Sequence, residues 1–390
     1  MDIAALTEIV RRPGPFASVY YDASHDTEDA EHAIELRWRD LRGQLAEQGA
    51  DDDMLRALDL AADTGIPAVG RAGRALVATG GEVVLDAELP DPPPRQEARF
   101  GPLPHLMPLL AQMPPAVPHV VAVVDRVGAE IRGYRVVGEP VMTREVRGEE
   151  HPAHKGGDGG WSHRKMQQRV ENLAEHNAAR IAGDIDRMVH DMSARLLVVA
   201  GEVQARKAVT ARLSPACRSI AVEAEAGGLA EGMDPEALAT EVRRLVGDRV
   251  DAERAESMDR FVAESGRARS GESGRAVATV RDVVAALRDG QVDTLLLLGD
   301  ATEDRELWVG AEPTQVAVDE DELRARGASR PVRDRADAAL LRAALDTGAT
   351  VRVVTEDRAE DLPEGVGALL RYAPTPAGAG TGGGRRAPRQ

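Results

Sequence analysis

The first hundred residues alternate between strand-like and helix-like patterns of apolar positions. Residues 17–24 predict a strand, and apolar positions at helical spacing predict helices over 28–48 and 51–63. Two short apolar runs then flank Gly80-Gly81, a dipeptide typical of a hairpin turn. We therefore expect a small α/β unit in this part of the chain.

Nine prolines between residues 92 and 118 interrupt this pattern. Proline fixes φ and removes an amide donor, so this stretch is expected to be a connector with at most one short helix, over 107–112. It marks the clearest boundary in the chain. We expect it to close an N-terminal α/β domain, 1–115.

The pattern that follows predicts a middle domain over 116–268 built around one long helix. Two apolar runs meet at Asp125-Arg126 and are typical of an antiparallel strand pair. A polar, glycine-rich loop over 138–160 comes next, and apolar positions within Ser162–Met192 then recur at steps of three and four, which predicts an amphipathic helix. The remaining elements expected here are a strand over 195–201, a helix over 202–213, a short strand over 218–224 and a helix over 234–264.

Two helix–strand pairs predict the third domain, 269–373. After a small polar stretch over 266–275, one helix ends at Gly290 and another at Gly348, and a strand follows each. Successive pairs of this kind are typical of a small α/β/α sandwich. The last residues, 374–390, have a low-complexity composition and are expected to be disordered. The chain is thus expected to be an α/β (α+β) protein of three domains.

Composition places the protein among ordinary globular proteins. Of its 390 residues, 43% are hydrophobic and only 3% aromatic, so the cores must be built from Leu, Val, Ala and Ile. The apolar stretches are too short to span a bilayer, and the N-terminus is unlike a signal peptide. Cys217 is the single cysteine, which excludes an internal disulfide, and we expect it to be a small buried residue. We expect a cytoplasmic protein without a membrane partner.

The net charge of −17 restricts how the chain could bind nucleic acid. A basic surface is the usual signature of phosphate binding. Any contact with RNA must therefore be a local patch on an acidic background, while the acidic helix over 234–265 is explained by solubility.

One segment, His154–Arg169, combines the features expected of such a patch. Four of the five residues from Gly156 to Gly160 are glycines, which lets the backbone approach another surface closely. The following helix begins with Arg164, Lys165 and Arg169, near the positive end of its dipole. Lys165 and Arg169 repel each other and have no carboxylate three or four residues away, so a bound phosphate would relieve the repulsion. The alternative is an ordinary surface loop whose cations contact other domains.

The same segment resembles the tip of the middle domain of archaeo-eukaryotic class-1 release factors, where Gly-Gly-Gln-Ser precedes a basic helix. Gly159, Gly160 and Ser162 match that pattern, and the order of elements is similar over residues 117–373. The similarity is to the bacterial branch, common in actinobacteria, of release-factor-like and peptidyl-tRNA hydrolase-like proteins, which includes ribosome hibernation factors of the Balon type. It implies a three-domain architecture and a place on the ribosome.

Trp161 departs from the family pattern because it stands where the catalytic glutamine would be. An indole has one N–H donor and no acceptor, so it cannot orient water as an amide does, but it can stack on a base. The N-terminal domain also lacks the Asn-Ile-Lys-Ser signature with which release factors read stop codons. The resemblance therefore implies that the protein occupies the A site without decoding, in ribosome hibernation or stress protection. It also implies that the third domain binds a translational GTPase such as elongation factor Tu.

The expected RNA-binding residues lie on both sides of Trp161. They are Lys155, Gly156, Gly157, Gly159, Gly160, Trp161, Ser162, His163, Arg164, Lys165 and Arg169. The expected ligands are ribosomal RNA of the A site and of the peptidyl-transferase region, with tRNA as a further candidate.

Two other functions stay open. A peptidyl-tRNA hydrolase that rescues stalled ribosomes would use Gln167 or Gln168 to orient water. An acidic, stress-related interaction module without ribosome contact would fit the net charge.

Other kinds of site find little support in the sequence. His151, His154 and His163 flank the loop, but their spacing is not that of a zinc site, so no metal is expected. Asp125 and Asp158 are candidate general bases whose geometry the sequence does not fix. No phosphate-binding glycine motif follows a strand, and no cofactor is expected.

Overall fold

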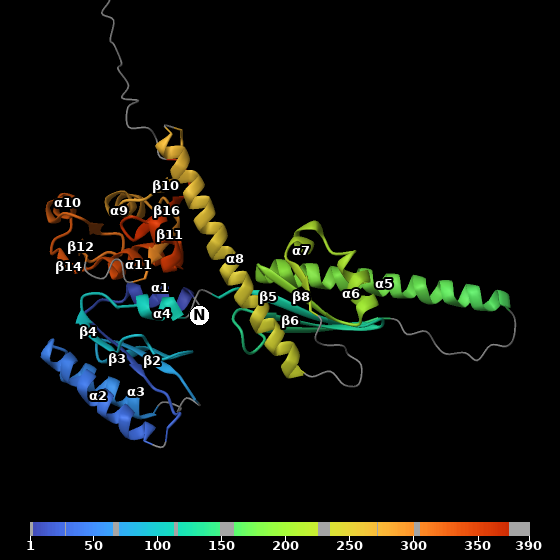
Figure 1. The fold of residues 1–390 in the computed structure, drawn as a ribbon, viewed down its shortest axis with the longest axis horizontal. Coiled ribbons are helices and arrows are strands. Elements are labelled where there is room, and N and C mark those ends of the chain that lie inside the picture. The colour runs from blue at the N-terminus through green and yellow to red at the C-terminus, as the bar shows by residue number, and fades with distance from the viewer. Residues whose placement is uncertain are drawn as a thin grey trace, which may run out of the picture. The chain divides into compact units, whose positions relative to one another are not determined.

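The computed structural model describes most of the chain, which is a mixed α/β protein with several sheets (Figure 1). Contacts divide it into unit 1, mainly Pro114–Ala255, and unit 2, which joins Ala4–Met113 to Glu256–Gln390. No helix in the described stretches is long and apolar enough to cross a bilayer. The described residues are 3–27, 29–64, 70–112, 116–148, 160–224, 235–270, 272–299 and 305–373, with only the backbone described for 3 and 160–172.

Unit 1 is built on a five-stranded mixed sheet with the order β7-β6-β5-β8-β9. β5 pairs with β6 in antiparallel fashion and with β8 in parallel fashion. The predicted strand pair on either side of Asp125-Arg126 is confirmed as β5 and β6. The strands are β5 (His119–Val124), β6 (Gly128–Tyr134), β7 (Met142–Arg147), β8 (Leu196–Gly201) and β9 (Ala221–Glu223).

Helices cover both faces of this sheet. Val120 and Ala122 of β5 share a core with α5 and α6, whereas Val121 and Val123 share one with the start of α8. Successive side chains of a strand point to opposite faces, so β5 is buried along its whole length. The helices are α5 (Gly160–Met192), α6 (Val203–Thr210), α7 (Pro215–Ser219) and α8 (Pro235–Arg269).

One sequence-based expectation for unit 1 is wrong, and one short helix was not predicted. Residues 142–147 were expected within a loop, but they form edge strand β7, whose side chains are exposed except for Val146 and therefore lack the usual apolar alternation. The helix expected over 202–213 is confirmed as α6. The short helix α7 that follows it was not predicted, and Ser214 caps it by accepting a hydrogen bond from the Cys217 amide.

The N-terminal part of unit 2, called here the N-lobe, is a four-stranded antiparallel sheet with the order β3-β2-β1-β4. The predicted helices α2 and α3 are confirmed and pack on the sheet through Leu41, Leu45 and Leu58. Helix α1 was not predicted. The elements are α1 (Ile3–Arg11), β1 (Phe16–Asp22), α2 (Ala30–Glu47), α3 (Asp52–Thr64), β2 (Gly73–Thr79), β3 (Glu82–Leu89), β4 (Glu97–Gly101) and α4 (Met107–Gln112).

The proline-rich stretch is more than a connector. The short helix predicted over 107–112 is confirmed as α4. However, Glu97–Gly101 form strand β4, which pairs with β1 at the edge of the sheet. This is possible because the five residues carry no proline, so their amides can take part in the ladder. The predicted boundaries 1–115, 116–268 and 269–373 remain a prediction.

The C-terminal part of unit 2, called here the C-lobe, contains the two predicted helix–strand pairs as α9 with β11 and α11 with β15. β11 and β15 are parallel neighbours in a sheet with the order β10-β16-β11-β15. The elements are β10 (Ala276–Val277), α9 (Val280–Arg288), β11 (Val292–Leu298), β12 (Glu306–Val309), β13 (Val316–Ala317), α10 (Glu320–Ala325), β14 (Val332–Arg335), α11 (Ala336–Asp346), β15 (Thr350–Val354), η2 (Glu356–Asp361) and β16 (Val366–Leu370).

The C-lobe sheet lies between helices. Met258 and Phe261 of α8 share a core with Leu296 and Leu369, and α9 and α11 also contact the sheet, in the predicted α/β/α layering (Figure 1). Two features were not predicted: the small sheet β13-β12-β14, and the continuation of α8 to Arg269, into the small polar stretch that begins at residue 266. The predicted tail, 374–390, lies outside the described residues.

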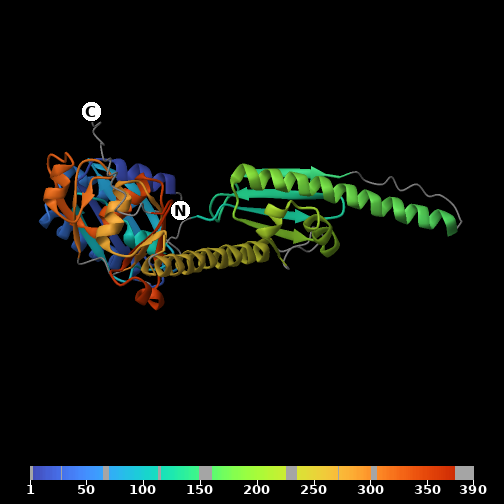
Figure 2. The same cartoon turned by 90° about the horizontal axis from the view of Figure 1, so that it is seen from above.

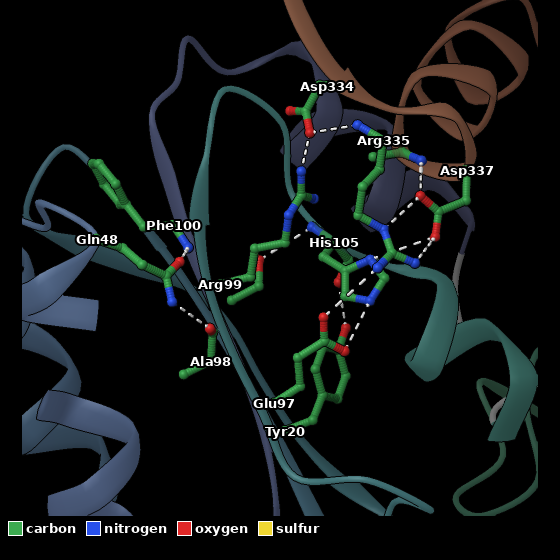
Figure 3. A network of polar contacts seen from close by, with 12 residues as sticks. Tyr20, Gln48, Glu97, Ala98, Arg99, Phe100, His105, Asp334, Arg335 and Asp337 are labelled. Carbon is green, nitrogen blue, oxygen red and sulfur yellow. Dashed lines mark hydrogen bonds and ion pairs between the residues drawn. The ribbon is translucent and has the colours of Figure 1, made fainter. Parts of the chain in front are cut away.

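A buried polar network joins the two lobes of unit 2 (Figure 3). Asp334 of β14 pairs with Arg99 of β4, and its carboxylate also accepts a hydrogen bond of 2.8 Å from the Leu103 amide. The Asp334 side chain is fully buried. If the lobes moved apart, the buried Asp334 carboxylate would lose its cationic partner, and an unpaired buried charge is costly. These contacts therefore fix the position of the N-lobe on the C-lobe.

His105 lies at the centre of the same network. Its Nε2 lies 3.3 Å from Glu97 Oε2, and its Nδ1 lies 3.7 Å from Oδ2 of Asp337, a fully buried carboxylate on α11. Arg335 pairs with Asp337 at 2.8 Å, and the Tyr20 hydroxyl donates to the His105 carbonyl oxygen at 2.6 Å. Burial alone would raise the pKa of Glu97, but the hydrogen bond with His105 and the neighbouring cations outweigh burial and lower it.

This lowered pKa predicts an acid-sensitive contribution of Glu97 to stability. A carboxylate with a lowered folded-state pKa stabilises the fold above its ordinary pKa and loses that contribution as pH falls through the lowered value. We expect Glu97→Gln to lower the melting temperature at pH 7, and the difference from wild type to close below about pH 4.

Thermal unfolding followed by circular dichroism across pH checks this expectation. Glu82→Gln is the control, because Glu82 forms an exposed pair with Arg12 and should matter little at any pH. A difference for Glu97→Gln that stays constant down to pH 3 would contradict the assignment.

Candidate nucleic-acid interface

The predicted site residues fall on the first turns of α5 and on the segment before it. Gly160 begins the helix, and Trp161, Ser162 and His163 follow in its first turn. The backbone is helical here, and the side chains of 160–172 are not described. The same holds for Arg164, Lys165, Gln167, Gln168 and Arg169, whereas His151, His154, Lys155, Gly156, Gly157, Asp158 and Gly159 lie outside the described residues.

The described side chains of α5 that belong to the core of unit 1 lie in the second half of the helix. They begin at Ala178, and Ile181, Ile185 and Met188 continue this apolar stripe at the predicted spacing. The part from Gly160 to His176, called here the arm, runs past the end of the sheet (Figures 1 and 2). At about 1.5 Å per residue, the arm is roughly 25 Å long.

Helical register places the predicted cations on one face of the arm. At about 100° per residue, Trp161, Arg164, Lys165, Gln168 and Arg169 fall within an arc of roughly 140°. The core stripe of the same helix is centred well over 90° away from the centre of that arc. The cationic arc is therefore centred away from the face with which α5 packs on the sheet, and it meets the edge of that face at Arg164, which shares the register of Ala182.

Cations near the base of the arm are neutralised by this chain. Asp184 of α5 accepts hydrogen bonds from Arg144 of β7 at 2.6 Å and from Arg187 at 2.5 Å. Nine residues earlier, at the base of the arm itself, Glu175 pairs with Arg212 at 3.5 Å. These cations hold β7 and the segment after α6 to the helix and are not available to bind a phosphate.

The strand end that leads toward the glycine-rich segment is held by a tight turn. Asp125 Oδ1 accepts hydrogen bonds from the amides of Val127 at 2.7 Å and Gly128 at 2.5 Å. The Val127 carbonyl oxygen in turn accepts one from the Gly148 amide, just after β7, at 2.5 Å. Asp125 therefore has a structural role in the turn, and the sequence-based interpretation as a general base loses its support.

Asn177 is a residue of this site that the sequence analysis did not single out. Its side chain is 3% exposed, and Nδ2 donates to the Arg126 carbonyl oxygen at 3.3 Å. The signal was present in the sequence, because Asn177 stands at a stripe position between Leu173 and Ile181 where an apolar residue is expected.

Two other candidate sites can be assessed from the described side chains. Cys217 is buried, as expected, and burial together with a hydrogen bond to Asp186 raises the pKa of its thiol, so it is not an activated nucleophile. Among the side chains that the structure describes, no three His, Cys, Asp or Glu residues are grouped as metal ligands.

Sequence comparison identifies the family of this chain. The profile of "Bacterial archaeo-eukaryotic release factor family 2" matches residues 118–267. The uncharacterized protein Rv2629 of Mycobacterium tuberculosis is 35% identical over 370 residues, which cover 94% of this chain and 96% of that protein. The chain belongs to the bacterial archaeo-eukaryotic release factor family. The family suspected from the glycine-rich segment is thereby confirmed.

Solved structures similar to this release-factor-like protein have low sequence identity to it. The archaeal translation termination factor aRF1 is 17% identical and covers 95% of this chain and 97% of its own, with a TM-score of 0.26. A chain in a model of ribosome-bound archaeal Pelota and ABCE1 is 15% identical, and the match covers 96% of this chain and 94% of that chain with a TM-score of 0.40. Dom34 of Saccharomyces cerevisiae is 10% identical, the match covers 78% of this chain and 82% of Dom34, and the TM-score is 0.38. The family assignment rests on the sequence matches.

Proposed function

We propose that this release-factor-family protein binds ribosomes and occupies the A site without reading a stop codon, protecting idle or stressed ribosomes. The observation that carries the proposal is the arm of α5. It extends past the core of unit 1, begins at Gly160 and carries Lys165 and Arg169 in a register that the core stripe does not use, with Arg164 at the edge of that stripe. Family membership supports the ribosome as the target.

The chemistry of the arm fits a contact with RNA backbone and bases. Cations that neutralise phosphates release condensed counterions, which favours binding at low salt. The helix dipole and the unpaired amides of the first turn add positive potential at the Gly160 end. We place this end, with Trp161, against ribosomal RNA of the peptidyl-transferase region, where the indole stacks on a base.

The remaining partners follow from the family. We propose that the predicted third domain, 269–373, binds a translational GTPase such as elongation factor Tu, and that the A-site position brings the protein close to tRNA. The predicted first domain, 1–115, lies at the decoding site in this proposal, without the motif that reads a stop codon. The protein acts in the cytoplasm, where ribosomes are.

Peptidyl-tRNA hydrolysis is the alternative function, and helical register bears on it. Gln168 shares the cationic face of the arm with Trp161, whereas Gln167 lies about 100° further round, toward the side of the core stripe. If a glutamine of this chain orients water in place of the family's Gly-Gly-Gln residue, Gln168 is the better candidate. An acidic interaction module without ribosome contact is the third possibility, and ribosome sedimentation excludes or supports it.

We expect the arm cations to control the salt dependence of ribosome binding. The triple substitution Arg164→Ala, Lys165→Ala, Arg169→Ala should lower the slope of log Kd against log salt concentration by roughly two to three units. Co-sedimentation of purified protein with ribosomes over a range of potassium chloride concentrations measures this slope.

A charge-matched control separates these three positions from net charge. Arg56→Ala, Arg244→Ala, Arg324→Ala also removes three positive charges, each from an exposed pair within one helix of another part of the chain. This variant should bind with the wild-type slope. Equal losses in both triple variants would contradict the proposal.

Substitutions at Trp161 test its position and the absence of catalysis together. Trp161→Ala should cost about 1–3 kcal/mol of ribosome affinity if the indole stacks on a base, and Trp161→Phe should cost less. Trp161→Gln restores the family's Gly-Gly-Gln and should give peptide release from ribosomes loaded with peptidyl-tRNA, whereas wild type should give none.

The same release assay decides between the two functions. Peptide release by wild type that disappears in Gln168→Ala would establish the hydrolase and overturn the non-catalytic proposal.

Ribosome affinity provides the separate test of stacking. An affinity of Trp161→Ala equal to that of wild type would contradict the proposed stacking of the indole on a base.

A further inference from the structure

Asn177 connects the helix of the arm to the strand end that precedes it in the chain. Its Nδ2 donates to the Arg126 carbonyl oxygen in the turn between β5 and β6. The next residue of that turn, Val127, accepts the hydrogen bond of the Gly148 amide. A single turn therefore contacts both ends of the excursion 149–176, which contains the glycine-rich segment and the arm.

The contact between the two ends is also a close packing contact. A Cβ atom added at Gly148 would lie 2.5 Å from Cγ and Nδ2 of Asn177, closer than real Cβ contacts allow. The Gly148 backbone thus lies directly against the Asn177 amide. Because Gly148 has no side chain, the strand end can approach the helix closely enough for this contact.

The position of Asn177 along α5 gives this contact its importance. Ala178, the next residue, is the first of the described α5 side chains in the core, so Asn177 stands where the anchored half of the helix meets the arm. A buried amide is costly unless it is hydrogen-bonded, and an aliphatic side chain would fill an apolar stripe without that requirement. The Asn177 amide therefore has a specific role, which is to hydrogen-bond to the 125–128 turn.

We infer that Asn177 is a positioning residue that ties Gly148 and the 125–128 turn to α5 and so fixes the base of the excursion 149–176. This inference rests on the proposed function, because what it positions is the RNA-contacting end of the arm. Holding both flanking residues lowers the entropy that is lost when the arm binds RNA. We call the contact of Asn177 with Gly148 and the 125–128 turn the tie. Without the tie, α5 keeps its core contacts from Ala178 onward, while the strand end is free to shift relative to the helix.

Two substitutions test the tie, one at each of its two partners. Asn177→Asp keeps the size of the side chain but removes the donor, and Gly148→Ala forces a methyl group against both the Val127 carbonyl oxygen and the Asn177 amide. Both should weaken binding to purified ribosomes by about tenfold and speed hydrogen exchange at the Gly148 amide. The control is Gly183→Ala, on the same helix with nothing within 4 Å of the added Cβ, which should bind as wild type.

A double substitution distinguishes positioning from a general loss of structure. In the background of Trp161→Ala, Arg164→Ala, Lys165→Ala, Arg169→Ala, the further substitution Asn177→Asp should have little effect on affinity, because the side-chain contacts that it positions are gone. A tenfold loss that persists in this background would mean that Asn177 acts on the fold as a whole, and would overturn the inference. So would wild-type exchange at Gly148 in Asn177→Asp.

The proposed function and this inference fail in different ways. Absence of ribosome binding by wild type would overturn the proposed function, and hydrogen exchange at Gly148 would still test the tie. Tight binding by wild type and by both tie variants would keep the proposed function and overturn the inference.

Discussion

The packing of the second half of α5 on the sheet of unit 1 is the interaction on which the rest of this unit depends. Ala178 to Val189 bury one stripe against β5, β6 and β8, and these contacts fix the helix. Helix formation needs a costly nucleus but propagates cheaply, so the anchored half supplies the nucleus from which the arm continues. A helix as short as the arm would be marginal on its own in water. The anchor therefore makes it possible to present Gly160 and the cations at a distance from the core.

Charge is used in two different ways in this chain. In unit 2, the buried carboxylate of Asp334 pairs with Arg99 of the other lobe and fixes one lobe on the other, while buried Asp337 pairs with Arg335 within the C-lobe. On the arm, three cations share a face of the helix and have no carboxylate at helical spacing to neutralise Lys165 or Arg169. A net charge of −17 is compatible with RNA binding when the positive charge is concentrated in this way.

The sequence was sufficient where a periodic apolar pattern coincides with an element. The α5 stripe, the strand pair at Asp125-Arg126 and the two helix–strand pairs of the C-lobe are of this kind. It was insufficient for β7, whose exposed edge position carries no alternation, for β4 among prolines, and for β12–β14, which have two to four residues each. Composition could pick out the glycine-rich segment and the arm cations as candidates. It could not assign a role to Asn177, because its partners on the 125–128 turn and at Gly148 come together only through tertiary packing.

The claim that α5 carries its Gly160 end to ribosomal RNA is tested most directly by site-specific photo-crosslinking in ribosome complexes. A photoreactive side chain at position 162, in the first turn of the arm, should crosslink to large-subunit ribosomal RNA of the peptidyl-transferase region. The same group at exposed position 244 of α8 provides the comparison. Crosslinks from position 162 that reach only protein, or none at all in complexes that form normally, would contradict the claim.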